Sequence, residues 1–133
     1  MKLTLASRSQ NYIRSYEPGH AHEKGLVRLN DRTLQNNCLI APEQVIDNWS
    51  ARDVATLSTT DLQPIFELKP ELVILGTGIH QQFPAAAIRA AFLAREIGFE
   101  VMDLGAACRT FNVLLSEDRR VVAALLLDMQ GRV

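Results

Sequence analysis

The first candidate for chemistry is a pair of glycines around a threonine, Gly76-Thr77-Gly78, placed directly after the apolar run Leu72–Leu75. Two glycines allow a positive φ and a close approach of the backbone to a ligand. Open α/β sheets bind ligands beyond the carboxyl ends of their strands, and a helix N-terminus there favours an anion. Asp103, 25 positions after Gly78, stands about where a dinucleotide-binding fold holds a ribose. This turn is therefore predicted to be a small-molecule or anion site.

The same residues depart from the known phosphate-binding motifs. A dinucleotide fingerprint needs a third glycine, and Gln81 stands at that position. Pro84 starts the following helix several residues late, and no Gly-Lys-Ser or Gly-Lys-Thr supplies a Walker-type loop. The structural alternative is a tight turn that lets strand and helix pack together. Both interpretations stay open.

A thiol beside a cation is the second candidate. Cys108 precedes Arg109 and is expected in the first turn of a helix, where the pKa of a thiol can be lowered. His80 would come near it if both lie at the carboxyl ends of the strands. The alternative is a small residue buried beneath the helix. Polar residues of the same region form either a binding face or a solvated surface: Arg109, Asn112, Glu117, Arg119 and Arg120.

Two histidines, His20 and His22, would share one face of a strand, which is a metal-capable spacing. No third ligand stands out beyond Glu23, so the alternative is a pair of solvated histidines on an edge strand. The sequence holds no motif of a serine hydrolase, a zinc protease or a pair of catalytic carboxylates. We therefore assign no catalytic residue, no metal and no cofactor. The ligand-binding candidates are Gly76, Thr77, Gly78, His80, Asp103, Cys108, Arg109 and Asn112.

Length and charge narrow the classes of partner. The chain of 133 residues fits a single domain, and 47% hydrophobic against 22% charged residues is typical of a globular protein with a core. Fourteen basic and 15 acidic residues give a net charge of -1, which predicts no long-range attraction to nucleic acid or to an anionic membrane. The two cysteines have no metal-binding spacing. With no leader and no membrane span in the sequence, we expect a cytoplasmic protein with reduced thiols.

The elements that must position these residues divide the domain into two portions. Residues 1–50 are β-rich, with short alternating segments separated by turn residues, and predict an antiparallel meander. Its expected strands are 12–16, 25–29, 34–40 and 45–49. An apolar edge of this portion would support a homodimer.

Residues 58–133 alternate helices with buried strands, which favours a mostly parallel central sheet. Thr60 and Gln63 match a capping box at the start of a helix that ends near Leu68, before Pro70. A second helix over 84–97, capped by Gly98, is apolar over most of its circumference and is expected to be largely buried. The remaining expected elements are strands over 72–75, 99–103 and 121–127 and a helix over 107–116.

Four runs in this second portion resemble a small family of domains of unknown function in archaea and bacteria, which includes the mitochondrial respiratory complex I assembly factor 3. The runs are 72–78, 98–103, 106–114 and 117–125. The resemblance implies a three-layer β+α/β/α fold with a mixed central sheet in which one strand is antiparallel. It implies no established enzyme activity. Phe111 stands where relatives often carry tyrosine, so a role of that hydroxyl would not transfer.

Two functions follow from these observations. The first is a non-catalytic interaction or assembly factor that contacts a protein partner in the assembly of a respiratory or membrane complex. It predicts a surface patch that is apolar or of one charge sign. The second is a small-molecule or anion-binding protein, or an enzyme, that uses the Gly76-Thr77-Gly78 loop.

Overall fold

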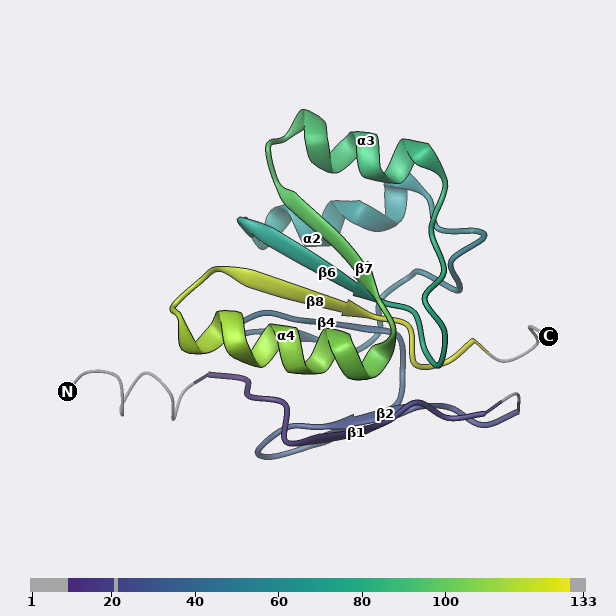
Figure 1. Ribbon diagram of the computed structural model, residues 1–133, viewed down its shortest axis with the longest axis vertical. Helices are drawn as coiled ribbons and strands as arrows, with labels where there is room; N and C mark the ends of the chain where they lie inside the picture. The colour runs from purple at the N-terminus through teal and green to yellow at the C-terminus, as the bar shows by residue number, and fades with distance from the viewer. Residues whose placement is uncertain (1–9, 21, 130–133) are drawn as a thin grey trace.

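A five-stranded sheet forms the middle of the molecule in the computed structural model, which describes residues 10–20 and 22–129 (Figure 1). Two neighbouring pairs, β6–β8 and β6–β7, are parallel. Strand β4 runs antiparallel to both of its neighbours, so it is the reversed strand of this mixed sheet, as the resemblance implied. The strands in spatial order are β5 (Val45–Ile46), β4 (Cys38–Ile40), β8 (Val121–Leu125), β6 (Leu72–Gly76) and β7 (Gly98–Met102).

Both faces of this sheet are covered, which explains why its central strands are continuous apolar runs. Successive side chains alternate between faces, so Val73 and Leu75 enter one core cluster while Ile74 enters the other. Helices α2 (Gln63–Glu67) and α3 (Ala86–Ala94) cover the first face. The second face is covered by α4 (Leu104–Ser116) and by a small sheet beside it (Figure 1). This arrangement confirms the predicted three-layer α/β fold.

The small sheet is the antiparallel meander expected from the β-rich portion, but it is shorter than predicted. It holds β1 (Ser15–Glu17), β2 (Leu26–Arg28) and β3 (Thr33–Leu34). The prediction of one strand over 34–40 was wrong, because the chain leaves this sheet after Leu34 and enters the central sheet at Cys38. The prediction over 45–49 was also too long, since β5 ends at Ile46. Between the two sheets, Asn37 bonds to loop backbone instead of to a strand.

The first helical segment begins earlier than the predicted capping box. A 3-10 turn, η1 (Thr59–Leu62), precedes α2, and the carboxylate of Asp61 accepts hydrogen bonds from the backbone and hydroxyl of Ser58 at 3.0 and 3.2 Å. The pair at this helix start is therefore Ser58 and Asp61, two positions before the predicted Thr60 and Gln63. The predicted end was right, because α2 stops at Glu67 and the residue before Pro70 has left helical geometry with φ 54°.

Helix α3 differs most from its prediction. Ile88 and Phe92 are buried, while Leu93 is 75% exposed and most of the alanines face outward. The helix also ends at Ala94, and Glu96, not Gly98, takes the left-handed conformation after it with φ 59°. A nine-residue helix that packs on a single sheet buries only the side that faces the sheet. Because the outward side is filled by alanine instead of charged residues, polarity alone could not reveal it.

The last helix, α4, starts at Leu104 instead of the predicted 107. The side chain of Asp103 accepts a hydrogen bond from the backbone N–H of Ala106 at 2.9 Å and so caps it. Cys108 therefore lies in the second turn of α4. In the part of the chain that the structure describes, no helix is long and apolar enough to cross a bilayer.

Candidate functional site

The loop after β6 is held by the side chain of Thr77, which is fully buried. The hydroxyl donates to the carbonyl of His80 at 2.7 Å and accepts from the backbone N–H of Gln82 at 3.1 Å. The Thr77 backbone N–H donates to the carbonyl of Met102 at 2.9 Å, which ties the loop to the end of β7. The hydroxyl thus fixes the shape of this turn and leaves no free group pointing into solvent from Thr77.

The two glycines are explained by packing. A Cβ at Gly76 would lie 2.8 Å from Cδ2 of Leu125 and 3.1 Å from Cβ of Ala107, so only glycine lets β6 approach α4 this closely. Gly78 has φ +86°, and its carbonyl accepts from the backbone N–H of Leu104 at 2.8 Å. The structural alternative stated for this turn therefore accounts for both residues.

Residues 126–129, which follow β8, lie beside this turn at the ends of the strands. Strand β6 connects to β7 on one side and has β8 on the other, so the topological switch point lies between β6 and β8. There the backbone N–H of Leu126 donates to the carbonyl of Gly76 at 3.0 Å. The methyl of Met129 would lie 2.9 Å from a Cβ at Gly78. The segment 126–129 thus occupies the position in which such folds bind a ligand.

Cys108 is buried in the core between α4 and the sheet, with 1% of its surface exposed. Burial raises the pKa of the Cys108 thiol to about 12, and the positive charge of Arg109 opposes that rise only in part. A thiol with such a pKa is neutral near pH 7 and is a poor nucleophile. The structure therefore agrees with the interpretation of Cys108 as a small packed residue.

Arg109 and Asn112 face the small sheet. They hold β1 and the residues just before it against α4. The guanidinium of Arg109 donates to the hydroxyl of Tyr16 at 2.6 Å. Asn112 brackets the backbone of Ile13, accepting from its N–H at 2.9 Å and donating to its carbonyl at 2.8 Å. These contacts join residues 93 and 99 positions apart in the sequence, so both side chains connect two layers of the fold.

Arg119 and Arg120 lie at the opposite ends of the strands from the glycine turn. Glu71, just before β6, accepts from the backbone N–H of Arg120 at 3.0 Å and from Nε of Arg119 at 2.8 Å. These two hydrogen bonds lower the pKa of the Glu71 carboxyl below its ordinary value, the backbone one most. The predicted polar residues are thus divided between the middle of α4, where Arg109 and Asn112 contact the small sheet, and the turn after it, where Arg119 and Arg120 contact Glu71.

The histidines near the N-terminal sheet do not lie on a regular strand. His20 forms an isolated bridge with Glu23, and His22 lies in the turn between them. Across residues 10–20 and 22–129, no three side chains of histidine, cysteine, aspartate or glutamate are grouped to hold a metal ion. The shared-face geometry on which the metal interpretation rested was therefore wrong.

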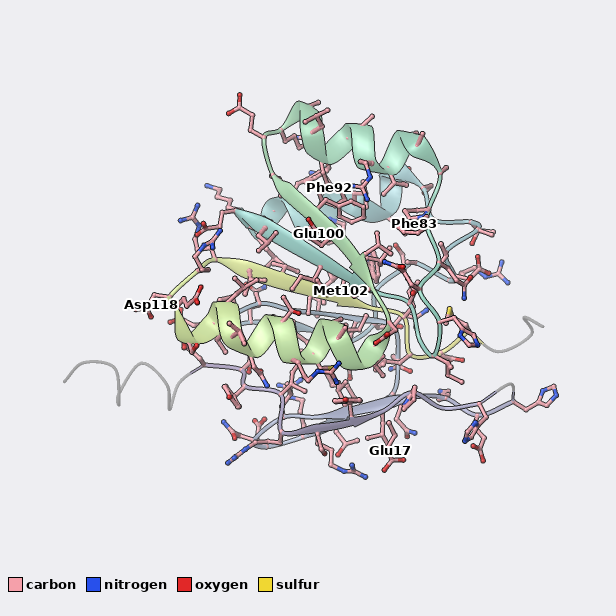
Figure 2. The ribbon with its side chains drawn as sticks, viewed as in Figure 1. Glu17, Phe83, Phe92, Glu100, Met102 and Asp118 are labelled. Atoms are coloured by element: carbon pink, nitrogen blue, oxygen red, sulfur yellow. The ribbon has the colours of Figure 1, made fainter. Side chains whose placement is uncertain are left out.

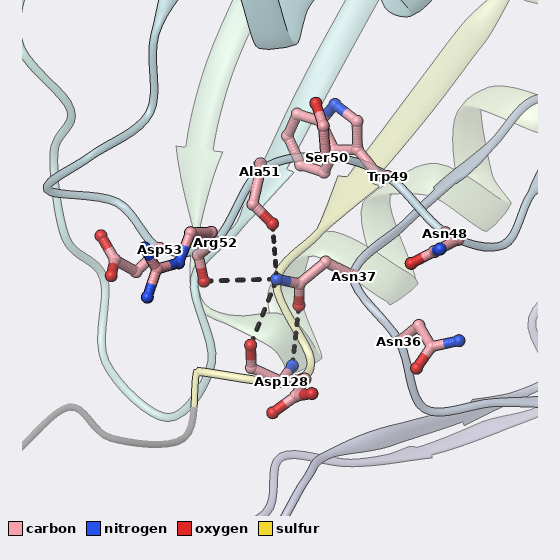
Figure 3. Close-up of a pocket in the computed structure, with 9 residues that line it drawn as sticks. All are labelled: Asn36, Asn37, Asn48, Trp49, Ser50, Ala51, Arg52, Asp53 and Asp128. Atoms are coloured by element: carbon pink, nitrogen blue, oxygen red, sulfur yellow. Dashed lines mark hydrogen bonds between the residues drawn. The ribbon is translucent and has the colours of Figure 1, made fainter.

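A polar cavity of about 430 Å³ was missed from the sequence (Figure 3). Asn37, 7% exposed, fixes one wall: its amide donates to the carbonyls of Ala51, Arg52 and Asp128 and accepts from the backbone N–H of Asp128 at 2.7 Å. The sequence feature that could have indicated this cavity was the polar pair Asn36-Asn37 between two apolar segments. The cavity is lined by Asn36, Asn37, Asn48, Trp49, Ser50, Ala51, Arg52, Asp53 and Asp128.

An apolar surface over α3 was missed as well. Phe83, at the start of this region in Figure 2, is 67% exposed, and Leu93 is 75% exposed. A concavity of about 420 Å³ joins them, and its lining residues are Phe83, Pro84, Ala86, Arg89, Ala90 and Leu93. We call these six residues the α3 face. The prediction of a buried helix hid this surface, although it is the kind of patch that the interaction hypothesis required.

The fold and these surfaces define a three-layer α/β domain in which Thr77, Asp103 and Cys108, three of the ligand-binding candidates, are used in loop closure, capping and packing. Residues 20–126 match the family described as a protein of unknown function (DUF498/DUF598), and the chain belongs to that family. It is 32% identical over 105 residues to NADH dehydrogenase [ubiquinone] 1 alpha subcomplex assembly factor 3 of Danio rerio, covering 77% of this chain and 60% of that protein. The chain thus spans less than two thirds of that relative.

Solved structures show the same architecture. A Xanthomonas campestris protein superposes with a TM-score of 0.78 and 31% identity, and the match covers 91% of this chain and 87% of the Xanthomonas chain. A Bordetella parapertussis protein gives a TM-score of 0.75 and 32% identity, covering 90% and 98% of the two chains. These matches extend over the β-rich portion as well as the alternating helices and strands, because each covers at least nine tenths of the chain.

Proposed function

We propose that this protein is a non-catalytic interaction module that helps to assemble a larger protein complex, a role like that named for its complex I assembly factor relatives. The observation that carries this proposal is the α3 face. Soluble domains seldom leave a contiguous apolar surface without a use, and such surfaces often mark contacts with a partner. Phe83 and Leu93 are large, exposed and joined by a concavity, which is the arrangement of an anchor site.

Two further observations support a binding role over a catalytic one. The side chains that might have carried chemistry have structural partners: Thr77 closes a loop, Asp103 caps α4 and Cys108 is packed in the core. The glycine turn is covered by the segment 126–129. A protein partner in the assembly of a respiratory or other membrane complex is the setting that the printed names of the relatives suggest.

The test is affinity purification of the full chain from its native cells, with two matched surface variants. Leu93→Arg places a charge in the α3 face, and Val113→Arg places the same charge on α4, on the other side of the sheet, where Val113 is 55% exposed. We expect the native chain and Val113→Arg to recover subunits of a membrane complex. Leu93→Arg should reduce that recovery about tenfold or more, because a charge in an apolar anchor site is costly.

Circular dichroism and thermal melting establish that both variants fold, since both positions are exposed. Equal recovery by the native chain and by Leu93→Arg would contradict the assignment of the binding surface. Absence of any membrane-complex subunit from the native sample would count against the assembly role itself.

A further inference from the structure

We propose that the α3 face receives an amphipathic α-helix with acidic flanks from a different protein, laid along α3. This inference rests on the proposed function and names the chemistry of the partner. Helix-in-groove binding and strand addition are two recurring ways in which a domain binds a segment of another chain. The structure favours helix binding on α3 over strand addition at β7.

Strand addition at β7 is blocked by side chains. β7 is an outer strand of the central sheet, and its Gly98 and Met102 backbones bond toward β6. The carbonyls that face away from β6 belong to Phe99 and Val101. The guanidinium of Arg89 donates to the Phe99 carbonyl at 3.4 Å, and the amide of Gln81 donates to the Val101 carbonyl at 2.8 Å. An added strand would have to displace both side chains, which is how natural proteins protect an edge.

The exposed side of α3 has the spacing of a helix-packing seam. Ala86, Ala90 and Leu93 recur at intervals of four and three residues and therefore share one face. Ile88 and Phe92 lie on the opposite side and are buried. Two alanines permit helix axes to approach to about 8 Å, and a leucine beside them can enter the facing groove. A partner helix of about two to three turns would cover the nine residues of α3.

The charged side chains that line the concavities on the two flanks of α3 are both positive. Arg89 is the single charged residue of the α3 face, and Arg95 is the single charged residue lining a second concavity, of about 750 Å³, on the other flank of the helix. Their guanidinium groups lie over the rings of Phe99 at 5.3 Å and Phe66 at 4.0 Å. Neither arginine forms an ion pair with a described residue.

An incoming carboxylate would therefore meet a positioned cation on either flank. A second copy of α3 would instead place Arg89 and Arg95 against like charges, which disfavours a homodimer through this face. A lipid surface also fits the face less well, because grooves on both flanks suit the side chains of a helix and the face has no lysine.

The test is selection from a displayed library of 16-residue helical peptides, randomised at seam and flank positions, against the full chain. We expect enriched peptides to keep an apolar stripe at helical spacing and to gain aspartate or glutamate on the flanks. Arg89→Glu should convert this preference to lysine and arginine and weaken acidic binders about tenfold, whereas Arg89→Lys should keep the acidic preference. Leu93→Arg should lose the selected peptides, and Val113→Arg should retain them.

Three results would overturn the inference. The first is enrichment of extended sequences, and the second is no enrichment at all. The third is that Arg89→Glu, with a native circular dichroism spectrum, selects peptides with the same flank charges as the native chain. Leu93-dependent sedimentation with anionic phosphatidylglycerol vesicles, without selection of helices, would assign the face to a membrane instead. If native purification still recovers a Leu93-dependent complex while the peptides show no acidic preference, the proposed function stands and this inference fails.

Discussion

Replacing Asn37 by alanine should destabilise this protein more than almost any other polar substitution. The residue is 7% exposed, and its side-chain amide bonds to backbone groups of residues 51–52 and 128, while its backbone carbonyl accepts from the N–H of Trp49. The substitution removes the side-chain donor and acceptor together. It leaves the carbonyl of Ala51 and the backbone N–H of Asp128, whose bonds of 2.8 and 2.7 Å are the shortest of the set, without these partners.

The magnitude follows from the number of buried groups left without a partner. Each costs about 1–3 kcal/mol when water cannot replace the lost bond. Two such groups would together cost about 2–6 kcal/mol. The cavity beside Asn37 admits water to part of this region, so we expect a loss in the lower half of that range, about 2–4 kcal/mol. For a domain of this size that loss lowers the melting temperature by roughly 10 °C and is a large share of a total stability of about 5–15 kcal/mol.

Urea unfolding followed by circular dichroism measures this difference, and Asn36→Ala is the matched control. Asn36 is the same residue type one position earlier, is half-exposed, and has no hydrogen bond drawn to it in Figure 3. It should change stability by less than about 0.5 kcal/mol. Native-state hydrogen exchange should quicken at the Asp128 amide in Asn37→Ala alone. If the two variants have the same unfolding midpoint, the reasoning from buried backbone partners is refuted.

Two other predictions concern the turn and the thiol first considered for chemistry. Gly78→Ala should destabilise the fold by about 1–2 kcal/mol in urea, because φ +86° is strained for alanine and its Cβ would meet Met129; an unchanged midpoint would show that the segment 126–129 does not lie on this turn. Cys108 should resist iodoacetamide at pH 8 in the native protein and react after unfolding, because burial raises its thiol pKa to about 12; rapid labelling of native protein, read by mass spectrometry, would contradict the buried geometry.

The mostly parallel character of the sheet could be predicted from the residues, whereas the three-layer order was implied by the family resemblance. The apolar runs at 72–75 and 121–127 required a sheet covered on both faces, and the alternation of strands with helices required parallel neighbours. The strand boundary predicted over 34–40 failed because of a contact between residues far apart in the sequence. Leu34 to Ile40 reads as one alternating strand, but the side chain of Asn37 bonds to the backbone of Ala51 and Asp128, far along the chain. Such a tertiary contact has no local pattern.

The candidate site was predicted as a set of residue types, and the structure distributes those types among different tasks. Gly76, Thr77 and Gly78 are together at the end of β6 as expected, while Arg109 and Asn112 face the small sheet and Cys108 faces the core. The helix start was misplaced by three residues, which put Cys108 in the first turn of α4 instead of the second. The layer that each of these side chains contacts is set by tertiary packing, which the sequence does not show.

The α3 helix shows how one misjudged face changes the functional interpretation. A helix rich in alanine is apolar on every side, so composition predicts burial, although alanine contributes little to a core and is tolerated at a surface. The two arginines supply the missing information: Arg89 and Arg95 stand over Phe99 and Phe66, at the borders of the buried side. Between them on the outer side lies a seam without a carboxylate. A surface that is apolar at its centre and cationic at its borders is better suited to a partner helix with acidic flanks than to solvent, and this is why we place the function of the domain on α3 and not at the glycine turn.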